Sequence, residues 1–568
     1  MTFDSTAPWV RNYSAGVPAA VDLPEGSLVN LVEDAAKQYG RNVALEFFGA
    51  ETSYRQLGES IQRAAEGLRR LGVVAGDRVA LVLPNCQQHV VAFYAVLRLG
   101  AIVVEHNPLY TDRELRHQFE DHGATVAIVW DKAAQRVQDL PADVPVSRIV
   151  TVDLTRAMPW TKRAALRLPV KKARQARAAL TTTAKLSGNR SVTSWDHLVS
   201  NRPLAATHPG PVATDVAALQ YTSGTTGHPK GAVLTHRNLL VNAAQGRAWV
   251  PGLQDGKEVI YAVLPMFHAY GLTLCLTFAM SIGAKLVLFP KFDEDLVLDA
   301  VKSSPPTFLP AVPPIYERLA KRAVERGISL KSVRFAFSGA MNLPPATIEL
   351  WESVTGGYLV EGYGLTETSP ISLGNPIGPT RKPGTVGVPF PNTEIRVVDP
   401  DDPARDRAPG ETGELLIRGP QVFQGYWRNI EDTRAVLTAD GWFKTGDIVR
   451  VDEDSFVTIV DRIKEIIVTG GFNVTPTEVE EALLAHDSVA DAAVVGMPLP
   501  GGGEEVVAAV VVRDGQPFSV DVLKAFCRGS LAAYKIPRRI VEVDELPRSL
   551  IGKVLRRQVR DQLIAGDS

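Results

Sequence analysis

A ribbon of hydroxyl and glycine residues with one lysine is the stretch of this sequence best suited to bind an anion. It reads YTSGTTGHPKG over residues 221–231. The glycines let backbone amides approach oxygen atoms closely, the hydroxyls can donate hydrogen bonds, and the lysine adds positive charge. The familiar phosphate loop has Ser or Thr after its Gly-Lys pair, whereas Gly231 follows Lys230 here. Taken alone, a polar surface loop explains the ribbon equally well. Its candidate ligand-binding residues are Thr222, Ser223, Gly224, Thr225, Thr226, Gly227 and Lys230.

Four further polar motifs follow the ribbon in a fixed order. Each has an ordinary structural explanation when taken singly: Asp447 could cap a turn, Arg462 could pair with a neighbouring acid, and Glu367 and Lys553 could be solvated charges. Together with the ribbon they form an ordered set, which favours a function. The motifs are FSGAMNL (337–343), YGLTETSP (363–370), FKTGD (443–447) preceding DRIKEIIVTGGFNVTPTEVE (461–480), and PRSLIGKVLRR (547–557).

This ordered set resembles the adenylate-forming superfamily of acyl-CoA synthetases, luciferases and peptide-synthetase adenylation domains. The likeness covers about residues 30 to 560 and is greatest to the fatty-acyl-CoA ligase branch. It implies an enzyme that uses ATP and Mg²⁺ to turn a carboxylic acid into an acyl-adenylate, with loss of pyrophosphate. A thiol of CoA then displaces AMP to give the thioester. The first step brings an anionic nucleophile against a polyanion, so such a site must supply positive charge.

The resemblance also implies roles for single residues. The ribbon would hold the β- and γ-phosphates, Thr366 would contact the α-phosphate, and Glu367 would bind Mg²⁺, which prefers oxygen ligands. Lys553 would bridge the substrate carboxylate and the α-phosphate in the transition state. Asp447 and Arg462 would bind the ribose. The adenine slot would be formed by Gly339, Ala340, Glu361, Gly362 and Tyr363, with the Tyr363 ring stacked on the base, and the neighbouring Gly364 would also bind ATP.

Two further elements of the family pattern concern the acyl group and CoA. LPMFHAYGL (264–272) marks the acyl entrance, with His268 beside the carboxylate, although a core histidine would look the same. No Asp, Glu, Lys or Arg lies between residues 268 and 284, which favours a fatty acid over an amino acid as substrate. Lys464 stands at the family's hinge. Gly470 and Gly471 would border the path of the CoA thiol.

The elements that must position these residues read as an α/β protein. Short apolar strands at residues 79–83, 101–104 and 126–130 alternate with helical patterns such as 87–99, and this rhythm predicts parallel sheets covered by helices. A second such block holds strands at 259–264, 285–289 and 334–337. We therefore expect a large N-terminal domain, residues 1–463, with two parallel-type sheets and a small antiparallel β subdomain at about 385–460. A smaller, mobile α+β domain, residues 464–568, would follow the hinge.

Composition limits the classes of function. A chain of 568 residues needs more than one domain. With 61 basic and 63 acidic residues it has no overall field to attract nucleic acid. Three scattered cysteines fit a reducing compartment rather than a disulfide framework or zinc site. The first residues do not resemble a secretory signal and no apolar run is long enough to span a bilayer, so a cytoplasmic protein is expected. A homodimer is one arrangement that the sequence leaves open.

One strongly basic segment departs from this balance. Between Leu154 and Trp195 there are ten Lys or Arg residues and no Asp or Glu. Several basic residues fall at helical spacing beside an apolar stripe, which suits peripheral contact with an anionic membrane at its inner surface. A solvated basic loop is an equal alternative, and Pro169 interrupts any single helix.

The main interpretation is a ligase that joins a medium- or long-chain fatty acid to CoA. Within the superfamily its rivals are a fatty-acyl-AMP ligase that loads a carrier protein and an aryl-acid–CoA ligase. From other classes come a non-catalytic lipid- or nucleotide-binding protein and a membrane-surface scaffold. The intact Lys553, Glu367 and Asp447 argue against a pure binder, which has no need of a transition-state lysine. A scaffold would leave the five motifs unexplained.

Overall fold

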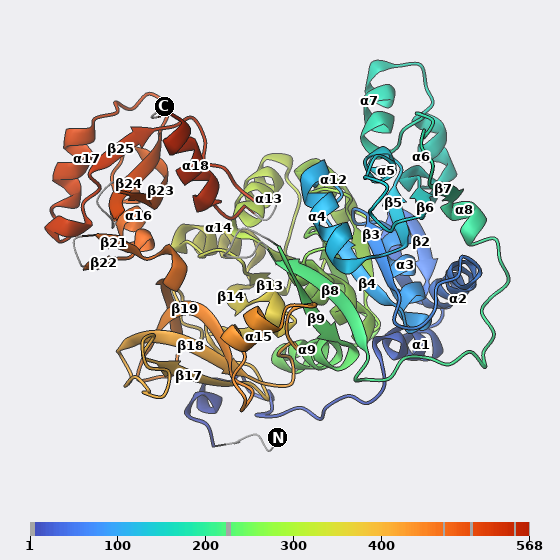
Figure 1. The fold of residues 1–568 in the computed structure, drawn as a ribbon, viewed down its shortest axis with the longest axis horizontal. Coiled ribbons are helices and arrows are strands. Elements are labelled where there is room, and N and C mark those ends of the chain that lie inside the picture. Colours follow the sequence, from blue (N-terminus) through green and yellow to red (C-terminus); the bar gives the residue numbers. More distant parts are fainter. Residues whose placement is uncertain (1–5, 223–228, 470–471, 500–503, 550–551, 567–568) are drawn as a thin grey trace. The chain divides into compact units, whose positions relative to one another are not determined.

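The computed structural model describes residues 6–222, 229–469, 472–499, 504–549 and 552–566, and the following refers to these residues (Figure 1). By packing, the chain divides into two compact units. Unit 1 comprises Met1–Pro383, Gly387–Glu394 and Arg418–Gly441. Unit 2 comprises Gly384–Val386, Ile395–Ile417 and Trp442–Ser568.

Unit 1 contains a seven-stranded sheet whose strands are parallel except for one edge hairpin. The predicted parallel sheet is confirmed: runs such as VAIVW are apolar throughout, and all residues of VAIVW except the half-buried Trp130 are buried. At the edge, β8 and β9 are antiparallel, with Thr222 opposite Lys230, so the ribbon joins two hairpin strands. In spatial order the strands are β7 (Ser191–Ser194), β6 (Arg148–Val152), β5 (Val126–Trp130), β3 (Arg78–Val82), β4 (Ile102–His106), β8 (Val216–Thr222) and β9 (Lys230–Thr235).

A nine-stranded sheet forms the second layer of strands in unit 1. Its centre is parallel, as predicted, and antiparallel strands complete both edges. The parallel pair β13–β14 places Ser338 beside Glu361. In spatial order the strands are β16 (Val388–Pro389), β15 (Ile371–Gly374), β14 (Tyr358–Gly364), β13 (Phe335–Ser338), β12 (Phe308–Ala311), β10 (Val259–Ala262), β11 (Lys285–Leu288), β1 (Val43–Phe47) and β2 (Ala50–Ser53).

The helices of unit 1 begin and end at recognisable signals. Thr111 and Glu114 form a capping box at the start of α4, and Gly123 ends it in the left-handed conformation at φ 64°. The longer helices are α1 (Leu28–Gln38), α2 (Tyr54–Arg70), α3 (Gln87–Arg98), α4 (Asp112–His122), α9 (His236–Trp249), α12 (Glu294–Val301), α13 (Pro313–Arg326), α14 (Pro345–Thr355) and α15 (Ile430–Val436).

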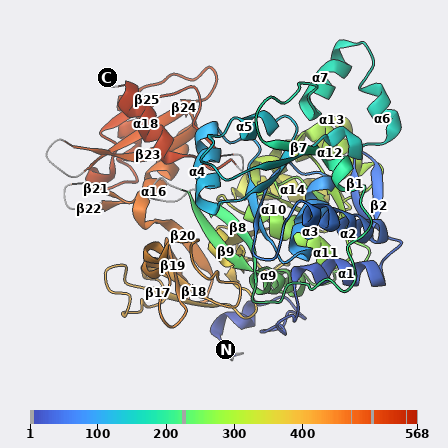
Figure 2. The same cartoon turned by 45° about the vertical axis from the view of Figure 1, so that its right-hand side comes forward.

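The basic segment folds as two short helices within unit 1. They are α6 (Trp160–Ala165) and α7 (Lys171–Leu180), so Pro169 separates them as its missing amide predicts. Figures 1 and 2 both show this pair, in teal, projecting from the rest of its unit. Within the described part of the chain, we find no helix with the length and apolar content needed to cross a membrane.

Unit 2 combines the predicted antiparallel sheet with the predicted α+β fold. The apolar side chains of Val479, Val494 and Val510 belong to one buried core, to which a three-stranded sheet of the C-terminal segment contributes. The antiparallel sheet is β17 (Glu394–Val398), β18 (Thr412–Arg418), β19 (Phe443–Val451) and β20 (Val457–Arg462). The remaining elements are β21 (Ile467–Thr469), β22 (Phe472–Val474), α16 (Pro476–Leu484), β23 (Val489–Pro498), β24 (Glu504–Val512), α17 (Val520–Cys527), β25 (Arg539–Glu542) and α18 (Arg556–Gly566).

The antiparallel sheet groups by packing with the C-terminal elements, whereas the sequence interpretation assigned it to the large domain. Most of its residues belong to unit 2. Packing and hinge position are separate properties of a chain, because a hinge lies where the backbone rotates. The predicted domain boundary between residues 463 and 464 therefore stays a prediction about motion.

Candidate active site

The predicted adenine-slot residues and the neighbouring Gly364 lie at the ends of two adjacent strands in unit 1. Gly339 and Ala340 follow β13, and Glu361, Gly362, Tyr363 and Gly364 are the last residues of β14. A Cβ on Gly339 would lie 3.3 Å from the Tyr270 ring, which is tighter than ordinary contact. A Cβ on Gly364 would lie 2.0 Å from the Pro370 carbonyl oxygen, so only glycine fits there. The structure thus places this whole group together.

Glu361 is a buried acid within that group. Only 7% of its surface is exposed, and burial raises its pKa to about 8, against a smaller lowering by the Leu343 amide that donates to it. At neutral pH the side chain therefore carries a proton. A neutral acid adds no negative charge to a site that is predicted to accept an anion.

Glu361→Gln is expected to remove a pH-dependent loss of stability. The protonated form of Glu361 contributes its full stability below the ordinary glutamate pKa, and this contribution is lost as pH rises through about 8. The thermal midpoint of the parent should therefore fall relative to that of Glu361→Gln between pH 5 and pH 9. Thermal melts of both proteins across this range measure the difference. Glu59→Gln, at an exposed position on α2, is the matched control, and equal pH profiles for parent and Glu361→Gln would contradict the prediction.

His268 stands at the head of the predicted acyl segment. It caps the short helix α10 (Ala269–Gly271), where its Nδ1 accepts a hydrogen bond of 3.2 Å from the Tyr270 amide. This contact places the hydrogen of a neutral ring on Nε2. Burial lowers the His268 pKa to about 4, so the imidazole is neutral at pH 7.

Residues after His268 connect this segment to the rest of the site. The Tyr270 hydroxyl donates to the Phe337 carbonyl oxygen at 2.8 Å, next to the adenine-slot residue Gly339. A buried π-helix, η3 (Leu272–Thr277), continues the chain, and the Thr273 hydroxyl donates to the Ser369 carbonyl oxygen at 2.6 Å. Such π-helical turns are rare and are frequent at functional sites. The segment is therefore fixed against both the adenine slot and the turn that carries Thr366.

Thr366 and Glu367 lie in a short turn after β14, named η4 (Thr366–Thr368). Glu367 is 8% exposed, and its Oε1 accepts a hydrogen bond of 2.8 Å from the Tyr426 hydroxyl. Its carbonyl oxygen accepts from the Phe423 amide at 2.8 Å. Burial and the nearby carboxylate both raise the Tyr426 pKa, so the phenol remains a donor. The carboxylate is held in one orientation.

Lys230 joins the same cluster from strand β9. Its Nζ lies 2.6 Å from an Asp432 carboxylate oxygen and 5.3 Å from the centre of the Tyr426 ring. Asn429 Nδ2 donates to the same Asp432 oxygen at 2.7 Å. The predicted phosphate lysine is thus close to the predicted magnesium ligand, with Tyr426 between them.

Tyr426, Asp432 and Tyr270 were missed by the sequence analysis. Each acts through a partner distant in sequence: Tyr426 contacts Glu367 across 59 residues, and Tyr270 contacts Phe337 across 67. The sequence QGYWRN around Tyr426 offers an aromatic pair after glycine as its only local signal. Such a pair is also ordinary core material.

Unit 2 brings together the two predicted ribose ligands. Asp447 on β19 lies opposite Arg462 on β20, and Arg462 Nε is 2.8 Å from Asp447 Oδ1. Asp447 is 1% exposed. Asp461 Oδ1 accepts a hydrogen bond of 2.7 Å from the Arg462 backbone amide. The carboxylate and guanidinium are aligned by strand register.

Lys553, in the same unit, contacts Ser549 through its backbone. Its amide donates to Ser549 Oγ at 3.1 Å, and its carbonyl oxygen accepts from the Ser549 amide at 2.8 Å. Arg548 donates to the Gly552 carbonyl oxygen at 2.6 Å and pairs with Asp491. These contacts hold Gly552 and Lys553 against Arg548 and Ser549.

The pKa of Lys553 is lowered to about 8. Burial is the largest cause and the positive charge of Arg462 adds to it, while Glu465 and Asp447 act in the opposite direction. These interactions place the lysine near the Asp447–Arg462 pair. Lys464, the predicted hinge, is exposed in the short turn η5 (Ile463–Glu465) that follows β20.

Some predicted residues lie outside the described part of the chain. They are Ser223, Gly224, Thr225, Thr226 and Gly227 of the ribbon, and Gly470 and Gly471 of the predicted CoA path. Thr222 and Lys230, which border the ribbon, are opposite one another in the β8–β9 hairpin.

The chain matches known protein families over most of its length. Residues 32–427 match the AMP-binding enzyme model, and residues 478–553 match the model of the AMP-binding enzyme C-terminal domain. The long-chain-fatty-acid–CoA ligase of Bacillus subtilis is 36% identical over 560 residues, covering 98% of each chain. That of Salmonella typhimurium is 37% identical over 558 residues, again covering 98% of each. An ATP-bound RpMatB–BxBclM chimera has a similar fold, with a TM-score of 0.81, 29% identity, and coverage of 95% of this chain and 100% of its own.

Proposed function

The chain belongs to the AMP-binding enzyme family, and on this basis we propose that it is a long-chain-fatty-acid–CoA ligase of the AMP-forming type. The observation that carries the proposal is end-to-end similarity to ligases of that name, which spans both units and both family models. In the first step a carboxylate oxygen attacks the α-phosphorus of ATP and pyrophosphate leaves. In the second the CoA sulfur attacks the acyl carbon, its proton is released, and the bond to AMP breaks.

Positive charge from two segments would assist the first step. Lys230 and the donors of the ribbon suit the β- and γ-phosphates, whose charge grows as pyrophosphate leaves. Asp432 holds the ammonium of Lys230 in place until the phosphates replace it. Lys553 suits the α-phosphate and the substrate carboxylate, with Thr366 as a hydroxyl donor and Asp447 as the acceptor for ribose hydroxyls.

The described residues suit a Mg²⁺ ion that is bound by one protein carboxylate together with the phosphates of ATP. No group of three or more His, Cys, Asp or Glu suited to a metal occurs among the described residues. Mg²⁺ commonly binds through one or two carboxylates together with substrate phosphates, so the single oriented carboxylate of Glu367 matches that need. When bound, the ion would neutralise phosphate charge.

Tyr426→Phe is expected to weaken the use of Mg²⁺ without removing activity. The change deletes one hydrogen bond to a carboxylate, and such bonds contribute about 1.5–3 kcal/mol. The Mg²⁺ concentration that gives half-maximal pyrophosphate release should therefore rise about tenfold. Tyr358→Phe, at an exposed tyrosine, is the matched control. A Tyr426→Phe enzyme with the parent's magnesium dependence would show that the hydroxyl does not position Glu367.

Two half-reactions in one site require a rearrangement, and we propose Lys464 as its hinge. In one pose the C-terminal segment would present Lys553 for adenylation. In the other, Gly470 and Gly471 would border the path of the CoA thiol. The exposed side chain and short helical turn at Lys464 suit a backbone rotation that leaves the surrounding strands intact. Lys464→Pro, which fixes φ, should slow the second step more than the first.

The substrate class follows from the acyl segment and the relatives. Residues from Ala269 to Met280 are buried and lack charge, so a tunnel lined by them would suit an alkyl chain. A panel of octanoate, dodecanoate, hexadecanoate and benzoate, assayed by pyrophosphate release with CoA present, tests this. Rates that are highest for dodecanoate or hexadecanoate support the fatty-acid ligase, whereas preference for benzoate would establish the aryl-acid alternative.

Peripheral membrane contact through residues 154–195 forms a further part of the proposal, together with a cytoplasmic location at the inner membrane surface. The exposed side chains of Trp160, Leu168 and Val170 on this basic segment support it. Self-association into a homodimer is testable by light scattering of the purified protein at several concentrations.

A further inference from the structure

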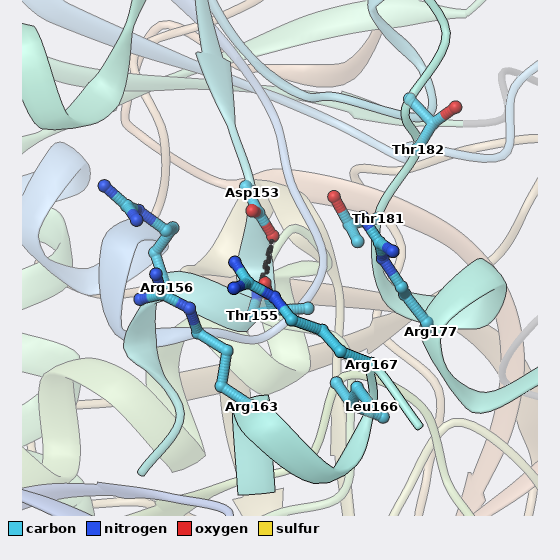
Figure 3. A pocket seen from close by; sticks show the side chains of 9 residues that line it. All are labelled: Asp153, Thr155, Arg156, Arg163, Leu166, Arg167, Arg177, Thr181 and Thr182. Atoms are coloured by element: carbon cyan, nitrogen blue, oxygen red, sulfur yellow. Dashed lines mark hydrogen bonds between the residues drawn. The ribbon is translucent and has the colours of Figure 1, made fainter. Parts of the chain in front are cut away.

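Four arginines line one small cavity at the base of the basic segment. Arg156 comes from the turn η2 (Leu154–Ala157), Arg163 from α6, Arg167 from the turn after α6, and Arg177 from α7 (Figure 3). Their side chains surround a space of about 100 Å³, enough for several water molecules or one tetrahedral oxyanion. None of these residues belongs to the candidate active site.

The positive charge of this cavity is largely uncompensated. Arg156 pairs with Asp196. The only acid lining the cavity, Asp153, accepts hydrogen bonds from the Thr155 amide and hydroxyl at 2.9 and 2.6 Å. Among the described residues, no carboxylate lies within 4.0 Å of the guanidinium groups of Arg163, Arg167 or Arg177. Three like charges gathered in this way favour a bound anion.

Hydrogen bonds between the end of β5 and the end of α7 hold one side of the cavity in place. At the end of β5, Asp131 accepts from the Thr181 hydroxyl and from the Thr182 amide. Trp130 Nε1 donates to the Leu180 carbonyl oxygen at 2.9 Å, and Lys132 Nζ donates to that of Ala178 at 2.6 Å. These contacts fix the C-terminal end of α7, and with it Arg177, at the carboxyl ends of β5 and β6. Parallel sheets commonly bind ligands at that edge.

We propose that Arg163, Arg167 and Arg177 form a binding site for a phosphate group, separate from the nucleotide site. Guanidinium groups match phosphate oxygens in a planar, two-pronged geometry, and the adjacent threonines suit the same ligand. The group belongs either to an anionic phospholipid or to a soluble phosphate ester. Exposed Trp160 at 80%, Leu168 at 54% and Val170 at 52% lie on the same segment, as a lipid-facing site requires.

Two binding experiments on the full-length protein distinguish these sources. In both, the nucleotide site is first saturated with a non-hydrolysable ATP analogue and magnesium. Calorimetric titration with glycerol 3-phosphate tests a soluble ester. Co-sedimentation with vesicles of 20% phosphatidic acid in phosphatidylcholine, against pure phosphatidylcholine, tests a lipid headgroup.

The test variant is Arg163→Gln with Arg167→Gln, and its control is Lys162→Gln with Arg174→Gln. The control removes the same charge from the same segment at residues that do not line the cavity. We expect binding in at least one experiment, weakened about tenfold or more in the test variant and by less than about threefold in the control. Vesicle binding alone identifies a lipid headgroup, and glycerol 3-phosphate binding alone a soluble ester.

Two results would overturn the proposal. One is an absence of binding by the parent protein in both experiments. The other is an equal loss in the test and control variants, which would show that the segment acts only by its general charge. Adenylation rates and thermal midpoints of both variants should match those of the parent. If the midpoint of the test variant is lowered, the titrations are repeated with Arg177→Lys, which retains the charge but loses the two-pronged geometry.

Discussion

Lys553→Ala should lower the rate of pyrophosphate release by about 100- to 1,000-fold, because it removes a preorganised charge from the transition state. The rate is measured with ATP, magnesium and dodecanoate in the absence of CoA. Thioester formation from supplied dodecanoyl-AMP and CoA should change little, since Lys553 is proposed to act only in the first step. Arg557→Ala, which removes an exposed positive charge four residues away, is the matched control. Undiminished pyrophosphate release would exclude the proposed role.

The pH profile of the parent should carry the signature of the same lysine. Lys553 is protonated below its pKa of about 8, so its stabilising charge is present there and is lost as pH rises through that value. The kcat/KM for pyrophosphate release reports groups of the free enzyme and should fall on the alkaline side of about pH 8. In Lys553→Arg any residual activity should lack this fall, because arginine stays charged.

Glu367→Gln is expected to have the second largest effect. The amide can still accept the hydrogen bond from Tyr426, so the local contact survives and the negative charge is lost. Pyrophosphate release at saturating ATP should fall about 100-fold at 1 mM magnesium. A loss of this size is typical when one preorganised charge interaction with the transition state is removed. Raising the magnesium concentration should recover part of that loss.

Two observations separate this effect from a general disturbance. Glu349→Gln, at an exposed position on α14, should behave like the parent. The thermal midpoint of Glu367→Gln should not fall, because burial of an uncharged amide costs less than burial of a carboxylate. A rate that falls by the same factor at every magnesium concentration would assign Glu367 a role other than binding the metal.

Local patterns in the sequence predicted most of the elements that position the site. VAIVW at residues 126–130 coincides with β5, and the helical pattern at 87–99 coincides with α3 to within one residue. Length and composition distinguish these two segments, because the strand is a short run rich in β-branched residues and the helix has 12 residues. The strand β9, which pairs antiparallel with β8, was not predicted, because KGAVLT lacks the alternation of apolar and polar residues that marks a half-buried strand.

The candidate site was predicted as separate motifs, and the structure shows how several of them meet. Register between β19 and β20 aligns Asp447 with Arg462, which no local spacing specifies. Tyr426 and Asp432, which orient Glu367 and Lys230, come from a segment without any motif of its own. Contacts of this kind depend on tertiary packing of distant segments, and sequence periodicity carries no information on them.

A single-turnover experiment tests the proposed ligase most directly. Purified protein, ATP, magnesium and radiolabelled hexadecanoate are mixed, stopped at intervals, and resolved into free acid, acyl-adenylate and thioester, with and without CoA. The proposed activity predicts that hexadecanoyl-AMP accumulates without CoA and is converted to hexadecanoyl-CoA when CoA is present, with both products lost in Lys553→Ala. Adenylate that forms but never passes to CoA would contradict the ligase and favour an enzyme that loads a carrier protein.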